Sequence, residues 1–363
     1  MRRYLTLTLC LMAMVMGQAQ KVLVVRQGDA RSLLEAVEQA NKMNADKQAK
    51  RLFILIPDGF YDLGETVLTR ITGHNIALVG MSMDGTVIQN KPDVKKEGIS
   101  KTAIFQNRGT GNYFQDMTLK NALDYYEAGP AGRAVTIQDK GTRTICNRVR
   151  MLSYQDTYYT DSEDGQIFLK DSEIHGTVDF ICGGGDVWFE TCRIVTEKRT
   201  RDGNSGRDVI AAPRTSLTPW GYIFNRCTVE NVVSNFEYAR GWNATPHCVW
   251  LHTTLLSPEK LNATRFDTRG MNTVASDFKE YGTTDANGRD ITPRSNVLTY
   301  TMTKKKTEGD KEIVRESSYT DETILTAEQA RKYTIANVFG DWQPERLTQE
   351  IERKARKLLK RLQ

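Results

Sequence analysis

The sequence predicts an all-β solenoid, in which short strands stack turn upon turn, and three observations support it. Segments rich in β-branched and aromatic residues are repeatedly broken by Gly, Asn and Asp. Similar apolar triplets recur, so that the pairs Phe189/Phe224 and Ile194/Val229 share one offset of 35 residues. Good helix candidates lie only near the two ends of the chain. Such recurrence is typical of solenoids, in which each turn buries its inward side chains against its neighbours.

An antiparallel β-sandwich is the alternative fold, because it also uses many short strands. Sandwich strands should alternate around tight two-residue hairpins. Here the segments recur as similar units separated by longer and uneven loops. This spacing favours the solenoid.

The first residues resemble a signal peptide rather than part of the fold. Arg2 and Arg3 precede an apolar run from Leu5 to Met16, and Gly17-Gln18-Ala19 fits a cleavage site. The run is shorter than the ~20 residues of a membrane span, and no later segment approaches that length. We therefore expect residues 1–19 to be a signal peptide and the protein to be exported, to the periplasm or outside.

The rest of the chain is interpreted as one body, residues 20–343, followed by a tail, residues 344–363. Residues Ala30 to Ala40 have apolar side chains at helical spacing and would form a short helix that caps the N-terminal end of the stack. The tail also has helical spacing, from Leu347 to Leu362, and carries a net charge of +4. It would pack on the solenoid as a solvated helix, or else contact an acidic polymer.

Charge and cysteine content exclude several protein classes. Without Arg2, Arg3 and the basic tail, the formal charge of +5 becomes about −1 for the body, which argues against nucleic-acid binding. Five of the six cysteines lie beyond Cys10, and their spacing matches neither a disulfide framework nor a zinc site. The histidines also lack metal-ligand spacing, so no metal or cofactor is expected. The disulfide state of the five cysteines stays open.

Two aspartates are the strongest candidates for chemistry. Asp156 lies in Tyr154-Gln155-Asp156-Thr157, and Asp179 lies 23 residues later in Gly176-Thr177-Val178-Asp179-Phe180. Each carboxylate stands among β-branched and aromatic residues, where an isolated charge is costly. Because 23 residues is about one solenoid turn, the pair would face each other from neighbouring turns. The pair suggests acid/base or nucleophilic chemistry.

These two strings resemble the pectin methylesterase family, whose members are carbohydrate esterases built on a right-handed parallel β-helix. The resemblance runs from about Val22 to Pro344. Weaker strings support it by their order along the chain: Gly59-Phe60-Tyr61 with Glu65, Val79-Gly80, Gly85-Thr86, Ala211-Ala212-Pro213-Arg214, Tyr238-Ala239-Arg240-Gly241-Trp242, Phe278-Lys279-Glu280-Tyr281, and Tyr333-Thr334 with Trp342.

The resemblance implies a role for each matching residue. Asp179 would be the nucleophile that attacks the methyl-ester carbonyl and forms an acyl-enzyme. Asp156 would begin protonated, give its proton to methanol, and later take one from water. Arg240 would hold the nucleophile ionised, Gln155 would stabilise the oxyanion, and Trp242 would form a sugar-stacking wall.

Three more residues are expected to bind substrate by the same resemblance: Arg133, Tyr159 and Phe180. Arg133 departs from the family pattern, because the usual Gln-Ala-Val string reads Arg133-Ala134-Val135 here. The arginine would serve the oxyanion, bind a neighbouring uronate carboxylate, or turn away. Gly241 is a second departure, since proline is common there.

The expected function is therefore hydrolysis of methyl esters in pectin, releasing methanol and needing no cofactor. Two alternatives stay open: another β-helix polysaccharide enzyme, either a glycosidase or a lyase, and a non-catalytic protein that binds uronate polymers. The charged loop from Glu197 to Arg207 would clamp an anionic chain or be merely solvated. The methylation pattern, the natural polymer and the oligomeric state are not determined by the sequence.

Overall fold

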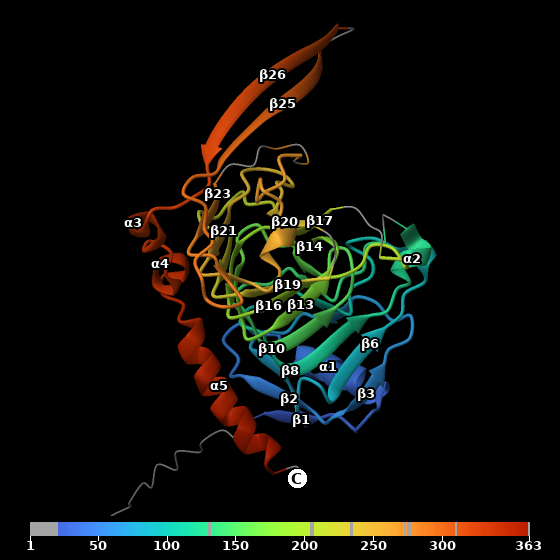
Figure 1. Ribbon diagram of the computed structural model, residues 1–363. Coiled ribbons are helices and arrows are strands. Elements are labelled where there is room, and N and C mark those ends of the chain that lie inside the picture. Colours follow the sequence, from blue (N-terminus) through green and yellow to red (C-terminus); the bar gives the residue numbers. More distant parts are fainter. Residues whose placement is uncertain are drawn as a thin grey trace, which may run out of the picture.

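The computed structural model describes residues 21–129, 132–203, 207–232, 235–269, 271, 273, 277–308 and 311–361 (Figure 1). The predicted signal peptide, residues 1–19, lies outside the described residues. Within the described residues the chain is a parallel β-helix with a 17-stranded and a 7-stranded sheet. Because the strand pairs of both sheets are parallel, the antiparallel sandwich is excluded and the predicted fold class is confirmed.

The strands of the larger sheet are β1 (Val22–Val24), β2 (Leu52–Ile56), β3 (Gly59–Asp62), β5 (Ile76–Gly80), β6 (Thr86–Asn90), β8 (Tyr113–Asn121), β10 (Thr144–Leu152), β12 (Gln166–Lys170), β13 (Glu173–Gly176), β15 (Asp186–Glu190), β16 (Arg193–Thr196), β18 (Tyr222–Asn225), β19 (Thr228–Asn231), β21 (Cys248–Leu251), β22 (Thr254–Leu255), β23 (Phe278–Tyr281) and β24 (Thr284–Asp285). The strands of the smaller sheet are β4 (Thr69–Ile71), β7 (Phe105–Asn107), β9 (Ile137–Asp139), β11 (Tyr158–Thr160), β14 (Val178–Gly183), β17 (Asp208–Pro213) and β20 (Phe236–Ala239). The helices are α1 (Ala30–Met43), α2 (Tyr125–Ala128), α3 (Ala327–Ala330), α4 (Ile335–Phe339) and α5 (Pro344–Leu359), with 3₁₀ turns at Val94–Lys96 and Pro258–Lys260.

The β-helix has three sides, because the larger sheet consists of two parallel ladders. The long strands β8 and β10 pair with each other over most of their length and belong to both ladders. One ladder continues from β10 to β12, and the other from β10 to β13. The smaller sheet forms the third side. Most turns of the chain therefore contribute a strand to each side, with β8 and β10 each serving two sides.

The repeat of 35 residues is confirmed as one turn of the stack. Phe189 on β15 pairs in register with Phe224 on β18, and Ile194 on β16 pairs with Val229 on β19. The two phenylalanine rings stack with centroids 4.3 Å apart, and Trp250 stacks on Phe224 at 3.9 Å. Like side chains are thus superposed along the axis, as the recurrent triplets indicate.

Alternation along β2 shows why whole strands are buried. Leu52, Ile54 and Ile56 belong to the core inside the β-helix, whereas Phe53 and Leu55 point outward into a second apolar layer. This layer continues along the first ladder of the larger sheet, and helices α3, α4 and α5 cover it. In Figure 1 these helices run along one side of the stack. We call this side the covered face.

The helix predicted to begin at Ala30 is confirmed as α1. The Asp29 side chain caps it by accepting a hydrogen bond from the Ser32 backbone N–H (3.0 Å). The apolar side of α1, which includes Leu33 and Val37, packs into the main core beside the first turns. This packing covers the N-terminal end of the stack with a helix (Figure 1).

The C-terminal part contains one element that the sequence interpretation did not anticipate. After β24 come β25 (Val297–Glu308) and β26 (Lys311–Glu322), an antiparallel hairpin that projects from the body in Figure 1. Beyond it, α5 occupies the tail that has helical spacing. Its residues Ile351 and Ala355 join the covered face, while Lys354 and Lys357 are exposed. Of the two alternatives for the tail, α5 has the geometry of a solvated helix packed on the solenoid.

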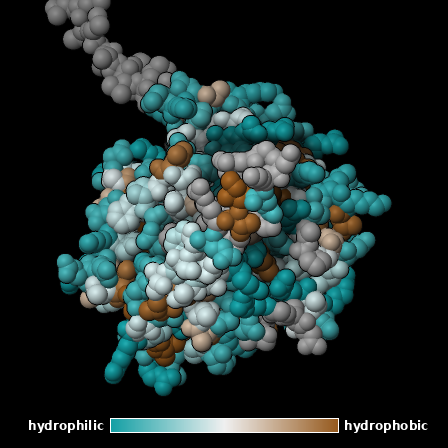
Figure 2. Space-filling model, turned by 90° about the horizontal axis from the view of Figure 1, so that it is seen from above, coloured by the Kyte–Doolittle hydropathy of each residue, from teal (hydrophilic) through white to brown (hydrophobic). Residues whose placement is uncertain are grey.

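All five described cysteines are buried and free of disulfides. None of the helices in the described ranges is long and apolar enough to cross a membrane. Seen from above, the surface is largely hydrophilic, and the hydrophobic side chains on this face form separate small patches (Figure 2).

Candidate active site

The two candidate aspartates occupy equivalent places on neighbouring turns. Strand β11 pairs with β14 so that Tyr158 lies opposite Ile181 and Tyr159 opposite Cys182, an offset of 23 residues. Asp156 and Asp179 have the same offset. Adjacent parallel strands lie ~4.8 Å apart. The register therefore brings the two aspartates to neighbouring positions on the outer side of the smaller sheet, which we call the site face.

Both aspartates have a left-handed backbone. Their φ angles are 59° for Asp156 and 53° for Asp179, a region that aspartate adopts more readily than most residues but still at some cost. Near Asp179 the register of β14 against β17 also shifts, between Val178 and Ile181, which is a β-bulge or a related irregularity. Such irregularities re-aim side chains beside active sites. Other non-glycine residues of the described chain, such as Asp116 and Asp171, share left-handed φ angles, so this conformation belongs to the turns of the stack and does not by itself mark the site.

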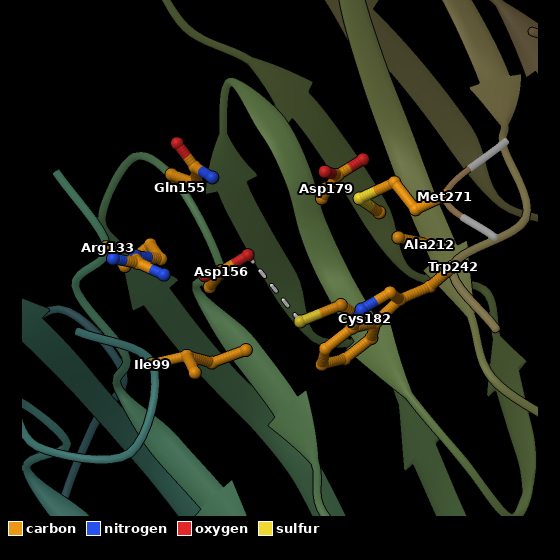
Figure 3. A pocket seen from close by; sticks show the side chains of 9 residues that line it. All are labelled: Ile99, Arg133, Gln155, Asp156, Asp179, Cys182, Ala212, Trp242 and Met271. Carbon is orange, nitrogen blue, oxygen red and sulfur yellow. Dashed lines mark hydrogen bonds between the residues drawn. The ribbon is translucent and has the colours of Figure 1, made fainter. Parts of the chain in front are cut away.

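Both carboxylates line a small cavity of about 130 Å³. Figure 3 shows Asp156 and Asp179 in its middle, with Arg133 and Ile99 on one side and Trp242 and Met271 on the other. Gln155, Cys182 and Ala212 complete the lining. The cavity joins a polar region around the aspartates to an apolar wall, a combination that is typical of small-molecule sites.

Asp156 has the surroundings of a proton donor. It is buried, and among the described residues no charged group forms a hydrogen bond with it. The Cys182 Sγ lies 3.7 Å from its Oδ1 and donates to it (Figure 3). Burial, followed by the negative charge of Asp179, raises the pKa of Asp156 well above its usual range. Of the pair, Asp156 is therefore the carboxyl group whose surroundings favour the protonated form more strongly.

Asp179 is equally buried but has a cationic partner. Arg240 donates from Nε to Oδ1 (2.8 Å) and from Nη2 to Oδ2, which makes a bidentate ion pair. Burial raises the pKa of Asp179, and the Arg240 pair opposes that rise. The two carboxyl groups thus differ in the way that a nucleophile and an acid require, since only Asp179 has a bound cation to stabilise its ionised form.

Arg133 stands beside Gln155, because an isolated parallel bridge joins the two residues across neighbouring turns. Its guanidinium lines the cavity and is held by Glu97, with Nε to Oε2 at 3.0 Å and Nη2 to Oε1 at 2.8 Å. Arg133 therefore does not turn away from the site. Glu97 was not identified from the sequence, where nothing near Lys95-Lys96-Glu97 marks it as a partner for Arg133.

The three aromatic residues of the predicted site have different positions. Trp242 is half-buried in the cavity wall, with the Arg214 guanidinium 4.9 Å from its ring centroid. Tyr159 lies behind it, with the ring centroids 5.9 Å apart and its hydroxyl donating to Asp161 (2.8 Å). Tyr159 is nearly buried, so its contact with substrate stays a prediction and its evident role is to support Trp242.

The structure corrects the prediction made for Phe180. It was expected to bind substrate, but its side chain is fully buried in the main core. Strict alternation would place Phe180 on the same face as Cys182, which lines the cavity. The register shift beside Asp179 breaks this alternation and turns Phe180 inward. Phe180 therefore anchors the strand from within.

Four cavity residues were missed by the sequence interpretation: Ile99, Cys182, Ala212 and Met271. The pairing of Cys182 with Tyr159, at the offset of the aspartates, is the signal that would have placed Cys182 on the site face. Ala212 follows in the same row, because it pairs with Cys182. Ile99 and Met271 come from loops, where no periodicity marks them. The described residues contain no group of three or more His, Cys, Asp or Glu arranged to hold a metal ion.

Comparisons with known proteins place this site in a family context. A family model described as Pectinesterase matches residues 21–254. "Pectinesterase 3" of Solanum lycopersicum is 33% identical over 172 residues, which are 47% of this chain and 29% of that protein. "Probable pectinesterase/pectinesterase inhibitor 42" of Arabidopsis thaliana is 28% identical over 258 residues, 62% of this chain and 46% of that protein. The matches thus span less than half the length of these two relatives.

Solved structures share the fold. "Pectin methylesterase PemA from Erwinia chrysanthemi" superposes with a TM-score of 0.66 at 22% identity, covering 89% of this chain and 98% of that one. "Pectin methylesterase from Carrot" has a TM-score of 0.59 at 21% identity, covering 73% and 83%. At these identities the likeness shows a common parallel β-helix.

Proposed function

Because the chain belongs to the pectinesterase family, we propose that it hydrolyses the methyl esters of galacturonate units in pectin, releasing methanol and leaving carboxylates on an intact polymer. One observation carries the proposal. Two buried aspartates stand at equivalent positions of neighbouring turns, and only one of them, Asp179, has an arginine bound to its carboxylate. This asymmetry supports one nucleophile and one proton carrier.

In the first half-reaction, the ionised Asp179 carboxylate attacks the carbonyl carbon of the ester. The carbonyl oxygen becomes an oxyanion, and Gln155 and Arg133, which both line the cavity, would stabilise it by donating hydrogen bonds. As the oxyanion collapses, the bond to the methoxy oxygen breaks and Asp156 gives that oxygen its proton. Methanol leaves, and the uronate acyl group is bound to Asp179 as an anhydride.

In the second half-reaction, Asp156 is ionised and takes a proton from an incoming water molecule. The resulting hydroxide attacks the acyl carbon, and the bond to Asp179 breaks. The polymer leaves with a free carboxylic acid group, Asp179 regains its carboxylate, and Asp156 is protonated again. Burial, the largest cause of the raised pKa of Asp156, makes its carboxylate basic enough for this step, in which Asp179 is acylated and uncharged.

Methanol release from methylated pectin tests the proposal. Asp179→Asn removes the nucleophilic oxygen with little change in shape and should lower turnover by at least ~10³-fold. Asp84→Asn is the matched control, because Asp84 is an exposed aspartate that also pairs with an arginine, Arg150. This control should keep wild-type turnover.

The products separate this proposal from its alternatives. An esterase leaves the number of reducing ends unchanged and forms no unsaturated sugars, whereas a glycosidase creates reducing ends and a lyase creates unsaturated ones. Binding without any release of methanol would indicate a non-catalytic protein. An active wild type with an equally active Asp179→Asn variant would refute the assigned nucleophile. Export by way of residues 1–19 stays a prediction, tested by locating the protein after fractionation of the producing cells.

A further inference from the structure

Arg133 is a cation beside a carboxyl group that must hold a proton. It lines the catalytic cavity together with Asp156, the proposed proton carrier. A positive charge at this position favours the ionised form of Asp156 and so opposes the first half-reaction, in which Asp156 donates its proton. An arginine here therefore requires a balancing negative charge. Glu97, which takes no part in either half-reaction, provides one.

The Glu97 carboxylate accepts three hydrogen bonds from Arg133. The Arg133 side chain donates from Nε to Oε2 (3.0 Å) and from Nη2 to Oε1 (2.8 Å), and its backbone N–H donates to Oε2 at a longer distance of 3.4 Å. The two side-chain bonds fix the plane of the guanidinium, because a planar fork fits a carboxylate in one orientation. None of these bonds uses Nη1, which keeps its two N–H groups for other acceptors.

The loop that follows Glu97 is held against the same arginine. The backbone N–H of Gly98 donates to the carbonyl oxygen of Arg133 (3.3 Å), and Thr102 donates to that oxygen from Oγ1 (3.2 Å). Ile99, which lies between Gly98 and Thr102 in the sequence, lines the catalytic cavity on the same side as Arg133 (Figure 3). Side-chain and backbone bonds therefore join this loop and Arg133 into one unit of the cavity wall.

Several groups face Asp156 from other parts of the chain, and its proton depends on their balance. Burial and then the charge of Asp179 raise the pKa of Asp156. Arg133, the Cys182 thiol and Arg240 lower that pKa, in this order. Arg240 is bound to Asp179, so their opposite charges offset each other. Arg133 is the cation that remains, and its effect on Asp156 depends on its own partner.

That partner, Glu97, is ionised at neutral pH. Hydrogen bonds from the Arg133 side chain lower the pKa of Glu97, and burial only partly opposes them. Lys101 makes a further, smaller contribution in the same direction. The Glu97 side chain is 24% exposed, so solvent screens its charge less than that of a fully exposed carboxylate. The pair of Arg133 and Glu97 therefore carries no net charge.

We infer that Glu97 is a positioning residue for ester hydrolysis, which orients the Arg133 guanidinium and cancels the charge that would otherwise draw the proton from Asp156. The inference rests on the proposed function and adds a residue to it. Glu97 is not among the described residues that line the cavity, so it acts through Arg133. Arg133 then serves as a fixed hydrogen-bond donor in a pair without net charge, and Asp156 keeps its proton to a higher pH than beside an unpaired arginine.

The pH dependence of kcat/KM for methanol release tests the charge balance, with fully methylated polygalacturonate as a substrate that has no titrating carboxylates. The alkaline limb reports loss of the proton from the acid of the free enzyme. Glu97→Gln keeps an acceptor but removes the charge, so the limb should move to lower pH by at least ~0.5 unit. Arg133→Gln should move it to higher pH by a similar amount. The double variant lacks both charges and should return the limb to within ~0.2 unit of wild type.

The orienting role has a separate readout. Glu97→Ala removes both bonds that fix the guanidinium and should lower kcat at least ~5-fold while changing KM less than ~2-fold. In the Arg133→Gln background the same change should alter kcat less than ~2-fold, because no guanidinium is left to orient. The matched control is Glu350→Gln, at a glutamate bound to Arg346 (3.2 Å) on α5, which should leave the limb, kcat and KM unchanged. Circular dichroism would verify that each variant is folded, and the nearly isosteric Glu97→Gln keeps the test open if Glu97→Ala does not fold.

Failure of this inference is distinguishable from failure of the proposed function. If the wild type releases no methanol, the proposed function fails and this inference falls with it. If methanol is released but the alkaline limb of Glu97→Gln stays in place or moves to higher pH, the proposed function stands and the charge-balancing role is overturned. A double variant that keeps the limb of Glu97→Gln would overturn it as well. An equal loss of kcat from Glu97→Ala in the wild-type and Arg133→Gln backgrounds would overturn the orienting role.

Discussion

The covered face and the site face are built from the same kind of short parallel strand but carry opposite outer layers. On the covered face, large apolar side chains such as Phe53 and Phe168 point outward into the layer that the C-terminal helices cover, where Phe168 packs against Phe339 of α4. On the site face, the row of outward residues includes Cys182 and Ala212, which leave room for a cavity. One side of the stack is closed by packing, and the other is open.

This difference shows how a solenoid can separate stability from chemistry. Burial of apolar area contributes about 25 cal/mol per Å², so the covered face is a large source of stability. Buried ion pairs such as Arg240 with Asp179 contribute little net stability, because desolvation offsets their attraction. Changes on the covered face should therefore affect unfolding, and changes on the site face should affect turnover.

The largest expected effect is on the covered face. Phe339→Ala removes a ring that is 1% exposed and packs against Phe168 and Trp342. It should lower the free energy of unfolding by ~3–5 kcal/mol, measured by urea denaturation, with kcat/KM unchanged below the transition. Leu217→Ala, at a leucine that is 73% exposed, should change stability by less than ~0.5 kcal/mol. A large loss of turnover in the folded Phe339→Ala variant would contradict the expectation that changes on the covered face affect only unfolding.

The reverse result is expected for Gln155→Ala on the site face. Loss of one oxyanion donor should lower kcat by ~10²-fold, about 2.7 kcal/mol, while the urea midpoint stays the same. Initial rates of methanol release measure the change. Gln48→Ala, at an exposed glutamine near the N-terminal cap, is the control and should leave both quantities alone. Unchanged kcat in Gln155→Ala would remove Gln155 from the mechanism.

Through Asp208, the free energy of unfolding of the protein should depend on pH. Its carboxyl group is fully buried, and burial raises its pKa to about 8, whereas an unfolded aspartate titrates near ~3.9. Between these two values the folded state holds a proton that the unfolded state has lost. Its contribution to stability therefore falls as the pH rises from ~4 to ~8, by up to ~1.4 kcal/mol per pH unit.

Asp208→Asn removes this titration. Urea unfolding at pH 5 and pH 8 should show the variant gaining stability relative to wild type as the pH rises. Asp341→Asn, at an exposed aspartate, gives the reference curve. If the Asp208→Asn and wild-type curves run parallel, the carboxyl group of Asp208 does not hold a proton in the folded protein over this pH range.

The smallest expected effect concerns Arg133, one of the two positions, with Gly241, at which the sequence departs from the pattern expected from the family resemblance. Arg133→Gln keeps a donor and should retain most of the turnover, whereas Arg133→Ala should lower kcat at least ~10-fold, about 1.4 kcal/mol. Arg133→Ala removes a donor and also leaves the Glu97 carboxylate without Arg133. The double variant Glu97→Gln with Arg133→Ala is needed to separate these two effects. Recovery of wild-type kcat in the double variant would show that Arg133 only neutralises Glu97.

Periodic features of the fold were predictable from the sequence. The repeat of Phe189 and Phe224 marks one turn, because like residues stack in a parallel β-helix and the stack selects similar side chains. The spacing of Asp156 and Asp179 was informative for the same reason. The apolar spacing after Ala30 predicts α1, since one side of that helix must be buried.

Features that depend on irregular backbone or on distant pairing were not predictable. The inward direction of Phe180 follows from a register shift beside Asp179, which no composition signals. Glu97 reaches Arg133 across 36 residues of sequence. The hairpin β25–β26 did leave a signal, because threonines alternate at Thr299, Thr301 and Thr303, but this alternation was not recognised.

The placement of Asp156 and Asp179 on consecutive turns has a consequence for how such a site can change over time. The gap between the proposed acid and the proposed nucleophile follows the spacing of adjacent strands, ~4.8 Å, which is among the least variable dimensions of a protein. Loops that leave the stack can then lengthen or shorten without disturbing the reacting pair. In this arrangement the stacked strands position the proposed reacting pair, and the loops that leave the stack can vary the contacts with substrate.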